Sequence, residues 1–409
     1  MQPACETERL MSRKDVLVVG GGVSGASLAF HAARAGRKVL LVEKSAEVGG
    51  CMQSVQTESG YWFELGAHTC YNSYGALLEL IESSGQLDKL VPRGKPVLKF
   101  MDDGRPLPGK NLGLLVKLFS KLEVLAAMPK WFLPKPTGLS VREYYSRLVG
   151  RGNYERVLGA MLSAVPSQPA DDFPSDMLFK KRERRKDIMR SFTVAGGLGT
   201  IIEGLVEHEN IEVRTGCSAS GVGRDASGYR VELSDGSTIE ADQLALAVPP
   251  PVVAELLTEA HPELAKRVST IGAVEVESLA FAVSADKSAL PYATFFIPLA
   301  DSFYSAVTRD VVADPDRRAF TFHFRPSTSR EERLSRVQEV VGIELADMQD
   351  LHERRVVLPS PAVGHAGLVE EIDAQLAGQP LAISGNWFAG LSIEDCVLRS
   401  RSEWARLTQ

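Results

Sequence analysis

The hydrophobic pattern near the start of the chain changes period twice. Residues 15–19 (DVLVV) form a short apolar, β-branched run that predicts a buried strand. After the glycine-rich segment 20–25 (GGGVSG), apolar positions recur at helical spacing up to Gly36, where a helix is expected to end. A second apolar run, residues 39–42, predicts another buried strand. This order of strand, glycine turn, helix and strand is typical of a nucleotide-binding unit.

The glycines have separate expected roles in this unit. Gly20 allows the tight turn, Gly22 lets a pyrophosphate approach the backbone, and Gly25 lets the helix lie close to the sheet. The amides of the first helical residues, Val23 and Ser24, would face the phosphates at the positive end of the helix dipole. We therefore expect a dinucleotide pyrophosphate at this turn.

An acidic residue ends the second predicted strand. Glu43 lies about 20 residues beyond the glycines, where a carboxylate accepts hydrogen bonds from the ribose hydroxyls of FAD or NAD. A carboxylate in this position argues against the 2′-phosphate of NADP. We include the neighbouring Lys44 in the predicted cofactor-binding set.

Strand and helix patterns continue along the chain. Residues 74–84 predict a helix, and a glycine-started helix follows residue 195. Strands are predicted over residues 211–214, 229–233, 238–240, 244–248, 274–283, 293–297, 303–307, 319–324 and 381–383, with a loop over residues 219–222. Near the C-terminus, Gly385, Asn386 and Gly390 precede a helix start at Ser392 with capping-box spacing. The chain is therefore of the α/β class.

Composition excludes several classes of protein. The chain has 409 residues, a formal net charge of −6 and 44% hydrophobic residues, which is ordinary for a soluble or peripheral globular protein and disfavours nucleic-acid binding. Five cysteines, at positions 5, 51, 70, 217 and 396, have no metal-ligand spacing, so we expect no metal site and a reducing, cytoplasmic location. The polar N-terminus predicts neither a signal peptide nor a transmembrane helix.

Two basic segments leave alternatives open. In residues 109–138, lysines interrupt apolar positions at helical spacing, as in a membrane-surface helix or a helix packed over the substrate site, and we favour packing. Residues 180–186 (KKRERRK) are the most basic run. Such a run is usually a solvated surface, although it also suits anionic lipid or a carboxylate-bearing substrate.

Several motifs resemble a known family. Gly49 and Gly50 follow Glu43 at the spacing of the glutathione-reductase-like FAD superfamily, although a Gly-Gly pair is also a common turn. The FELG motif at residues 63–66 makes the chain similar to the flavin amine oxidase superfamily, and most of all to protoporphyrinogen oxidases. Residues 359–365 fit the Pro-x-x-x-Val-Gly-His pattern of those oxidases, and residues 385–396 resemble their Gly-Asn-x-x-x-Gly-x-Ser-x-x-Asp-Cys pattern.

The resemblance implies a fold and a set of cofactor contacts. It implies a glutathione-reductase-like FAD-binding Rossmann domain built from residues 14–70, 191–265 and 378–409, and an α+β substrate-binding domain built from residues 71–190 and 266–377. FAD would be bound non-covalently. The expected contacts beyond the first unit are Gly49, Gly50, Cys51, Gly66, Ala67 and His68 near the diphosphate and the isoalloxazine, Ala219 near adenine, and Gly385, Asn386, Gly390, Ser392 and Ile393 near the flavin pyrimidine.

Two histidines are candidate catalytic residues by the same resemblance. His68 would lie beside the isoalloxazine, and His365 belongs to the Val-Gly-His motif. Each has a plain alternative as a hydrogen-bonded structural histidine. The chain departs from the family at Cys51, where Arg or Trp is usual, and residues 271–276 lack the lysine that many amine oxidases carry there.

These observations together predict the chemistry. We expect an FAD-dependent oxidoreductase that transfers hydride from a small-molecule C–H, next to nitrogen or in a ring as in protoporphyrinogen, to flavin N5, with reoxidation by O2 or another acceptor. One alternative is a redox-neutral isomerase or mutase, or a biosynthetic desaturase, of the same fold. Another is a membrane-surface FAD-binding scaffold.

Overall fold

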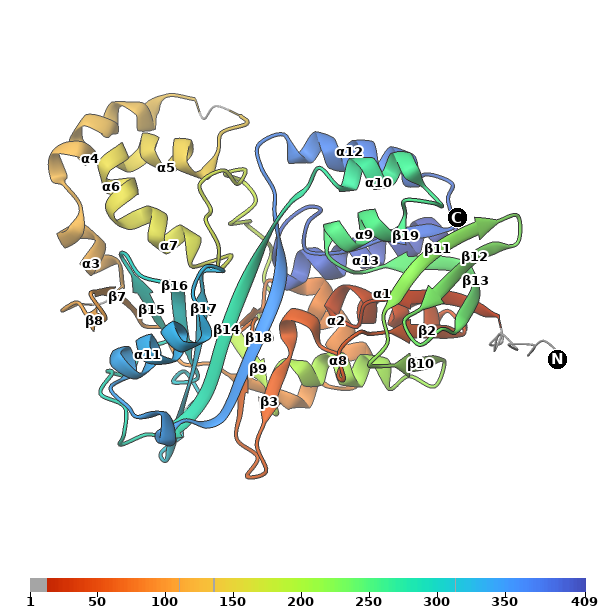
Figure 1. Cartoon of the computed structure of the whole chain (residues 1–409). Helices are drawn as coiled ribbons and strands as arrows, with labels where there is room; N and C mark the ends of the chain where they lie inside the picture. The colour runs from red at the N-terminus through yellow and green to blue at the C-terminus, as the bar shows by residue number, and fades with distance from the viewer. Residues whose placement is uncertain (1–12, 110, 135–136, 313) are drawn as a thin grey trace, which may run out of the picture.

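The computed structural model describes residues 13–109, 111–134, 137–312 and 314–409 (Figure 1). Its architecture is mixed α/β, as predicted, and contains two seven-stranded sheets. The first sheet comprises β1 (Lys14–Val19), β2 (Val39–Val42), β10 (Ile211–Arg214), β11 (Ala219–Asp225), β12 (Gly228–Leu233), β13 (Thr238–Leu246) and β19 (Leu381–Ile383). The second comprises β7 (Leu98–Asp102), β8 (Arg105–Pro106), β14 (Gly272–Ser284), β15 (Phe295–Pro298), β16 (Phe303–Thr308), β17 (Arg317–Phe324) and β18 (Gln349–Ser360).

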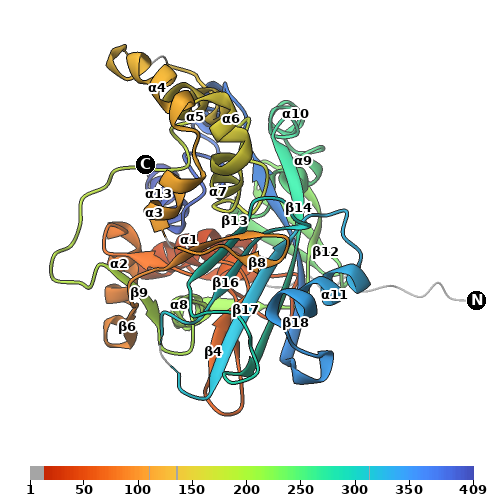
Figure 2. The same cartoon turned by 90° about the vertical axis from the view of Figure 1, so that its left-hand side faces the viewer.

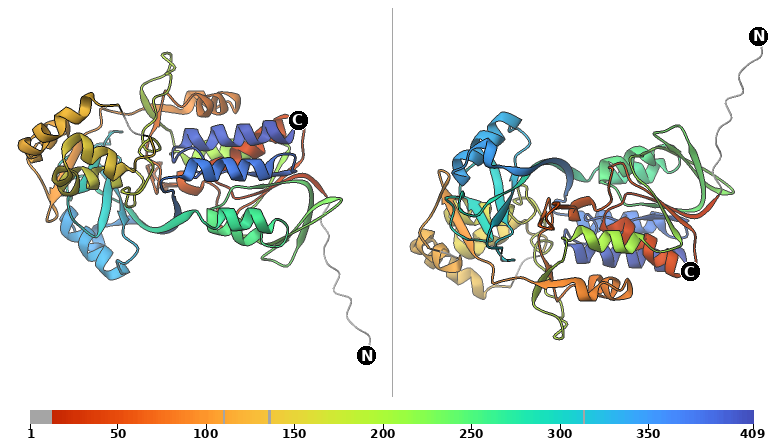
Figure 3. Two further views of the ribbon diagram at one scale, coloured as in Figure 1. Left: turned by 90° about the horizontal axis from the view of Figure 1, so that it is seen from above. Right: turned by 90° about the horizontal axis from the view of Figure 1, so that it is seen from below.

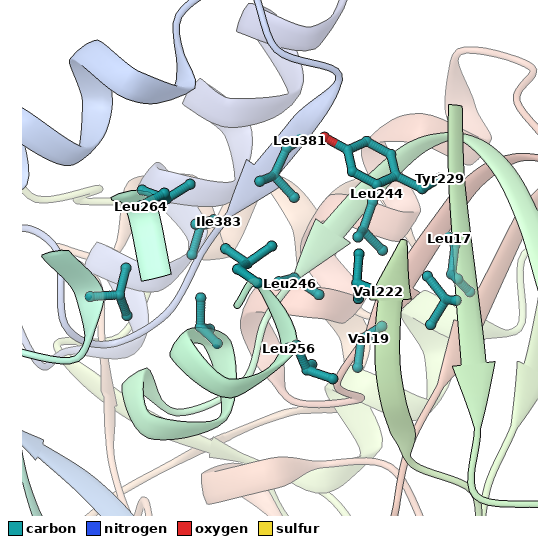
Figure 4. Packing of buried hydrophobic residues seen from close by; sticks show 14 of the residues in the cluster. Leu17, Val19, Val222, Tyr229, Leu244, Leu246, Leu256, Leu264, Leu381 and Ile383 are labelled. Carbon is teal, nitrogen blue, oxygen red and sulfur yellow. The ribbon is translucent and has the colours of Figure 1, made fainter. Parts of the chain in front are cut away.

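The first sheet is parallel at its centre and is covered on both faces. Strands β10, β2, β1, β13 and β19 pair in parallel in this order. One face of β1, with Val16 and Val18, packs on α1 (Val23–Arg34) and α13 (Ile393–Leu407). The other face, with Leu17 and Val19, belongs to a core shared with β11, β12 and the helices α9 (Pro250–Leu256), α10 (Pro262–Val268) and α12 (His365–Leu376), as Figure 4 shows in part. Alternation along one strand thus produces three layers.

Two sequence predictions in this region are wrong. Residues 238–240 and 244–248 were expected to form separate strands, but β13 is one continuous strand. Its first half pairs antiparallel with β12, and its second half pairs in parallel with β1 and β19, so one strand serves both a hairpin and the central sheet. Residues 219–222 were expected to be a loop, but they begin β11, because Ala219 and Val222 pair with β12.

The second sheet is packed on one face by helix α11 (Arg330–Val341). Its opposite face carries small side chains, Ala280, Ala282 and Ala319, against which the hairpin of β3 (Ser54–Gln56) and β4 (Trp62–Glu64) packs. A further small sheet joins β5 (Cys70–Tyr71), β9 (Ser191–Val194) and β6 (Leu90–Pro92), and lies beside α2 (Gly75–Ser83) and α8 (Gly199–Val206). The hairpin β3–β4 therefore connects the first sheet to the second.

A helical lobe extends from the second sheet, at the top left of Figure 1 and the top of Figure 2. It contains α3 (Asn111–Leu118), α4 (Lys121–Ala127), α5 (Val141–Val149), α6 (Arg151–Asn153) and α7 (Gly159–Ser163), with a 3-10 turn η3 (Met128–Phe132) and a π turn η4 (Tyr154–Leu158). Shorter 3-10 turns are η1 (Gly50–Met52), η2 (Leu87–Lys89) and η5 (Leu345–Asp347). Figure 3 shows this lobe at the end of the molecule opposite the first sheet. Among the described helices, none combines the length and apolar composition needed to cross a membrane.

The origin of the strands agrees with a discontinuous arrangement of domains. The first sheet takes strands from three separate stretches of chain, and the second takes strands from residues on both sides of β9 to β13. The limits that we assigned to the two domains, and the glutathione-reductase-like classification, stay predictions.

Candidate functional site

The glycine turn after β1 has a geometry that only glycine allows. Gly20 has φ +106°, and a side-chain carbon there would overlap the carbonyl oxygen of Ala247. A side-chain carbon at Gly25 would overlap the carbonyl oxygen of Gly20. Helix α1 begins at Gly22 without a side-chain cap and without an acidic residue in its first turn. Its first amides are therefore available to an anion, as the sequence predicts for a pyrophosphate.

Glu43 braces this turn from the end of β2. Its carboxylate accepts hydrogen bonds from the amide of Gly21 at 2.7 Å and from the amide of Ser45 at 2.8 Å, and the residue is buried. Each carboxylate oxygen has a second lone pair. Glu43 can therefore hold the turn and still accept hydrogen bonds from ribose hydroxyls. The role of Gly21 was missed from the sequence, whereas Lys44 is exposed.

The second glycine pair packs directly on the first turn. The amide of Gly49 donates to the carbonyl of Gly21 at 2.9 Å, and Gly22 and Gly49 form an isolated parallel bridge. Gly50 has φ +52°, and a side-chain carbon on it would lie 2.7 Å from the Cα of Gly22. An ordinary surface turn would not need this contact. The pair therefore packs as a second wall on the glycine turn that follows β1.

The FELG segment joins the same region through Cys51. The carbonyl of Cys51 accepts a hydrogen bond from the amide of Ala67 at 2.7 Å, and a side-chain carbon at Gly66 would lie 2.6 Å from that carbonyl oxygen. The structure thus brings the predicted contacts 49–51 and 66–67 together. The predicted adenine contact Ala219 lies two residues beyond Cys217, whose amide donates to the carbonyl of Glu43 at 3.0 Å.

The C-terminal helix α13 begins with the predicted capping box. The Ser392 hydroxyl accepts from the amide of Asp395, and the Asp395 carboxylate accepts from the amide of Ser392. Further along the helix, the Ser400 hydroxyl donates to the carbonyl of Ser24 at 2.8 Å, which holds α13 against the first turn of α1. A side-chain carbon at Gly390 would overlap Asp395. Helix α13 therefore lies against the first turn of α1, and residues 385–392 lead into α13.

Two residues of the basic run also reach this helix start. Lys180 Nζ lies 3.0 Å from Asp395 Oδ1, and an Nη atom of Arg182 lies 2.8 Å from the same oxygen. Although burial by itself raises the pKa of Asp395, the hydrogen bonds from Ser392 and the two cations lower it overall. The expectation of a fully solvated run is wrong for these two residues. The sequence gives no signal for this pairing, because more than 200 residues separate the partners in the chain.

His68 is the first member of a hydrogen-bonded chain. Its Nε2 lies 3.2 Å from Nε2 of His323 on β17, and His323 Nδ1 lies 2.9 Å from the hydroxyl of Ser278 on β14. Burial lowers the pKa of His68 well below the usual value, and it lowers the pKa of His323 to about 4. Both imidazoles are therefore neutral at pH 7. His323 and Ser278 were missed, although His323 shares the inward face of β17 with Ala319 and Thr321.

His365 has a different environment. It is the first residue of α12, it is buried, and its Nε2 contacts the carbonyl oxygen of Trp387. Burial lowers its pKa, while hydrogen bonds to the backbone oppose that change. This contact holds the segment next to Asn386, which fits the structural alternative. Its assignment as a catalytic residue stays a prediction.

Comparisons with known proteins agree with this geometry. Residues 23–285 match the family described as flavin containing amine oxidoreductase. Protoporphyrinogen oxidase of Bos taurus is 25% identical over 472 aligned positions, which cover 96% of this chain and 98% of the relative. A solved structure of a candidate protoporphyrinogen oxidase from Exiguobacterium sp. 255-15 has a TM-score of 0.80 at 22% identity and covers 98% of this chain and 100% of that one. Reduced UDP-galactopyranose mutase has a TM-score of 0.74 at 16% identity, covering 97% and 95%.

The glycine turn allows a direct test. In Gly25→Ala the added methyl group overlaps the carbonyl oxygen of Gly20. Such overpacking costs about 1–3 kcal/mol. We expect the same loss in the free energy of cofactor binding, which corresponds to binding that is about 5- to 150-fold weaker. The ratio of flavin to protein absorbance in the purified variant measures the effect.

Gly367→Ala in α12 is the matched control, because a side-chain carbon at that position has no neighbour within 4 Å. It should keep the flavin content of the unmodified protein. Equal flavin content in both variants would contradict the role of the turn.

Proposed function

We propose that this chain, which belongs to the flavin-containing amine oxidoreductase family, is an FAD-dependent oxidoreductase that oxidises a C–H bond of a small molecule. The family carries a flavin. The observation that supports FAD most strongly is the contact between the two glycine turns, with Gly50 against Gly22 and Gly49 hydrogen-bonded to Gly21. A lone glycine turn would suit NAD equally well, whereas a second glycine turn packed on it agrees with the resemblance of Gly49 and Gly50 to the acid-then-Gly-Gly spacing of the FAD superfamily.

The residues present fit a non-covalent flavin. The amides at the start of α1 would hold the pyrophosphate, and Glu43 would hold the adenosine ribose. Burial raises the pKa of the Cys396 thiol to about 12, so this thiol stays protonated and unreactive at neutral pH. Cys396 is a buried free thiol in α13, which agrees with a packing role and with a flavin that is not covalently attached.

The bound flavin would supply the hydride acceptor, its N5 atom. The protein contributes the electrostatic surroundings. The N-terminal end of α13 stabilises negative charge that develops near it, because its amides carry a partial positive charge. The first turn of α13 also carries the carboxyl groups of Glu394 and Asp395, and Lys180 and Arg182 offset their negative charge. Both effects favour the reduced, anionic state of a cofactor at this position.

We assign His68 the role of accepting the proton that the substrate loses together with the hydride. The His68–His323 pair exists in two tautomeric arrangements, and the neutral imidazole of His68 has a free lone pair, on Nδ1, only in the one where its Nε2–H donates to His323 Nε2. Ser278 supports both arrangements, because a hydroxyl can donate or accept. His323 and Ser278 would therefore act as positioning residues.

Protoporphyrinogen is the leading substrate. The supporting observations are the similarity to protoporphyrinogen oxidase along almost the whole chain and the absence of a lysine in residues 271–276. Oxygen is the electron acceptor that we propose. The TM-score of 0.74 with reduced UDP-galactopyranose mutase supports one alternative, a redox-neutral enzyme of the same fold. That enzyme would need a reduced flavin and would consume no oxidant.

Anaerobic mixing separates these functions. We expect protoporphyrinogen to bleach the flavin absorbance with two electrons taken up per flavin, amines to leave it unchanged, and oxygen to restore it. The readout is stopped-flow absorbance at the flavin band. If only amines bleach the flavin, the protein is an amine oxidase. If no substrate bleaches it, the proposal that the protein catalyses a net oxidation is contradicted.

Replacing His68 tests its role as the proton acceptor. In His68→Gln, kcat should fall about 100-fold or more, as for loss of a general base, and Ser278→Ala should cause a smaller loss. Because the pKa of His68 lies well below 6.5, the histidine is already neutral above pH 6. The rate of flavin reduction should therefore be constant from pH 6 to 8 and fall only at lower pH. A fall centred between pH 6 and 7, or full activity in His68→Gln, would contradict the assignment.

We also propose a peripheral membrane contact through an apolar edge made of Val116, Leu122, Leu125 and Phe132. These side chains are 66%, 79%, 60% and 84% exposed. Leu114 and Leu115 are buried, as a packed helix requires, whereas Leu122 and Leu125 are exposed. Lys117, Lys121 and Lys130 are exposed around the edge. Several exposed apolar side chains with surrounding lysines are typical of an anionic lipid surface.

The one acidic residue of this segment does not oppose such a contact. Glu123 accepts hydrogen bonds from Arg156 at 2.7 Å and from the amide of Asn153 at 2.8 Å. Its charge is therefore neutralised within the lobe. Lys110 and Lys135, which belong to the same predicted segment, lie outside the described residues.

Vesicle sedimentation tests the membrane contact. The double variant Leu122→Ser/Phe132→Ser should bind vesicles of phosphatidylcholine and phosphatidylserine about 100-fold more weakly, because each buried side chain contributes about 1.5 kcal/mol and 1.4 kcal/mol is a tenfold change. Leu345→Ser, which alters another exposed leucine (48% exposed), is the control. Equal binding by both variants, or no binding by the unmodified protein, would exclude the contact.

A further inference from the structure

A small cavity with both polar and apolar walls lies where the β3–β4 hairpin meets the second sheet. It has a volume of about 30 Å³ and opens to solvent. Its walls come from β4, β9, β16 and β17 and from the segment after β6. The charged or titratable side chains that line it are Glu64, His68, Arg93 and Arg309. The cavity is thus formed by the second sheet together with the two small sheets, and its charged or titratable groups are two arginines, one acid and one histidine.

Arg93 has no counterion there. Among the residues that the structure describes, none forms a hydrogen bond or an ion pair with the Arg93 guanidinium, although burial lowers its pKa. Other buried arginines are paired: Arg318 lies 2.7 Å from Asp310, and Arg336 lies 2.7 Å from Asp301. A buried charge without a partner is costly, so such groups are normally paired. Arg93 therefore has the environment expected of an arginine that binds an anion from outside the chain.

Arg309 is held by aromatic rings rather than by a carboxylate. Its guanidinium lies 4.1 Å from the ring centroid of Trp62 and 4.3 Å from that of Tyr61. It donates to the carbonyl of Val312 at 3.2 Å, while its buried Nε has no hydrogen-bond partner. Stacking fixes the plane of the group, and the bond to Val312 uses only part of its donors. This is a rigid second donor for the same anion.

Glu64 does not neutralise the two cations. Its carboxyl group accepts hydrogen bonds from the Ser54 hydroxyl at 2.5 Å, from the Leu198 amide at 3.0 Å and from the Thr193 hydroxyl at 3.4 Å. Burial raises its pKa to about 7. The carboxyl group is therefore committed to other partners and is about half protonated at neutral pH. The cavity keeps a positive charge.

We propose that this cavity is a binding site for the carboxylate group of a small organic anion, held between Arg93 and Arg309. A water molecule needs about 10–15 Å³ of such volume, so the cavity has room for about two water-sized atoms, as the two oxygens of a carboxylate require. A tetrahedral phosphate with four oxygens needs more space. The remainder of the ligand would extend through the open mouth. The site does not depend on the proposed function.

The probe is acetate, which is titrated into the flavin-loaded protein in chloride-free buffer. Binding is measured by calorimetry and by the intrinsic fluorescence, to which Trp62 in the cavity wall contributes. We expect saturable binding that is at least 10-fold weaker in Arg93→Gln and partly kept in Arg93→Lys. Arg267→Gln, which alters an exposed arginine paired with Glu371, should bind as the unmodified protein does. An unchanged melting temperature in Arg93→Gln shows that the fold is intact.

The pH dependence gives an independent readout. Because the pKa of Glu64 is raised, the group is neutral below pH 7 and becomes a repelling anion above it. Acetate binding should therefore weaken as pH rises through about 7, and Glu64→Gln should remove this dependence. Tighter binding of inorganic phosphate than of acetate, equal binding in Arg93→Gln, or no saturable binding would overturn the proposal.

Competition identifies the source of the carboxylate. If it belongs to the substrate, acetate should inhibit oxidation competitively and Arg93→Gln should raise KM more than it lowers kcat. If it belongs to a separate acid, saturating substrate should leave acetate binding unchanged. Both results support the site, and the calorimetry remains decisive if the protein fails to oxidise any porphyrinogen.

Discussion

The fold around the nucleotide depends on the close contact of two glycine turns. Gly50 has no room for a side chain against Gly22, and Gly25 has none against Gly20. Glu43 joins β2 to this contact, because one carboxylate binds the amides of Gly21 and Ser45. Backbone therefore lies against backbone where a cofactor diphosphate would pass, and amides rather than side chains form the surface. The rest of the site is arranged around this point.

Distant parts of the chain reach the turn through single polar contacts. Ser400 on α13 donates to the carbonyl of Ser24, and Lys180 and Arg182 from the middle of the chain bind Asp395 at the start of the same helix. On the other side, Ala67 donates to Cys51 and leads to His68, which meets His323 of the second sheet. The nucleotide unit is thus coupled to the substrate sheet through the β3–β4 hairpin. Catalysis at this junction would depend on both sheets.

The sequence predicts the features that local chemistry determines. Periodicity and turn glycines identify β1, α1 and β2, and the Ser392 capping box is present as expected. Prediction from the sequence fails where pairing between strands determines the structure. Examples are the continuous strand β13 and strand β11, which was expected to be a loop. The His68–His323 contact spans 255 positions, so no local pattern could reveal it. The basic run has the same limit. Its charges alone indicate a solvated surface, whereas in the structure Lys180 and Arg182 pair with Asp395.

The most direct test of this account is a crystal structure of the purified protein with its bound cofactor. We expect FAD with its pyrophosphate on the amides of residues 20–25, its adenosine ribose on Glu43, and its isoalloxazine between residues 66–68 and the start of α13. A nicotinamide nucleotide at the glycine turn would contradict the account. So would FAD whose isoalloxazine lies away from His68 and Ser392.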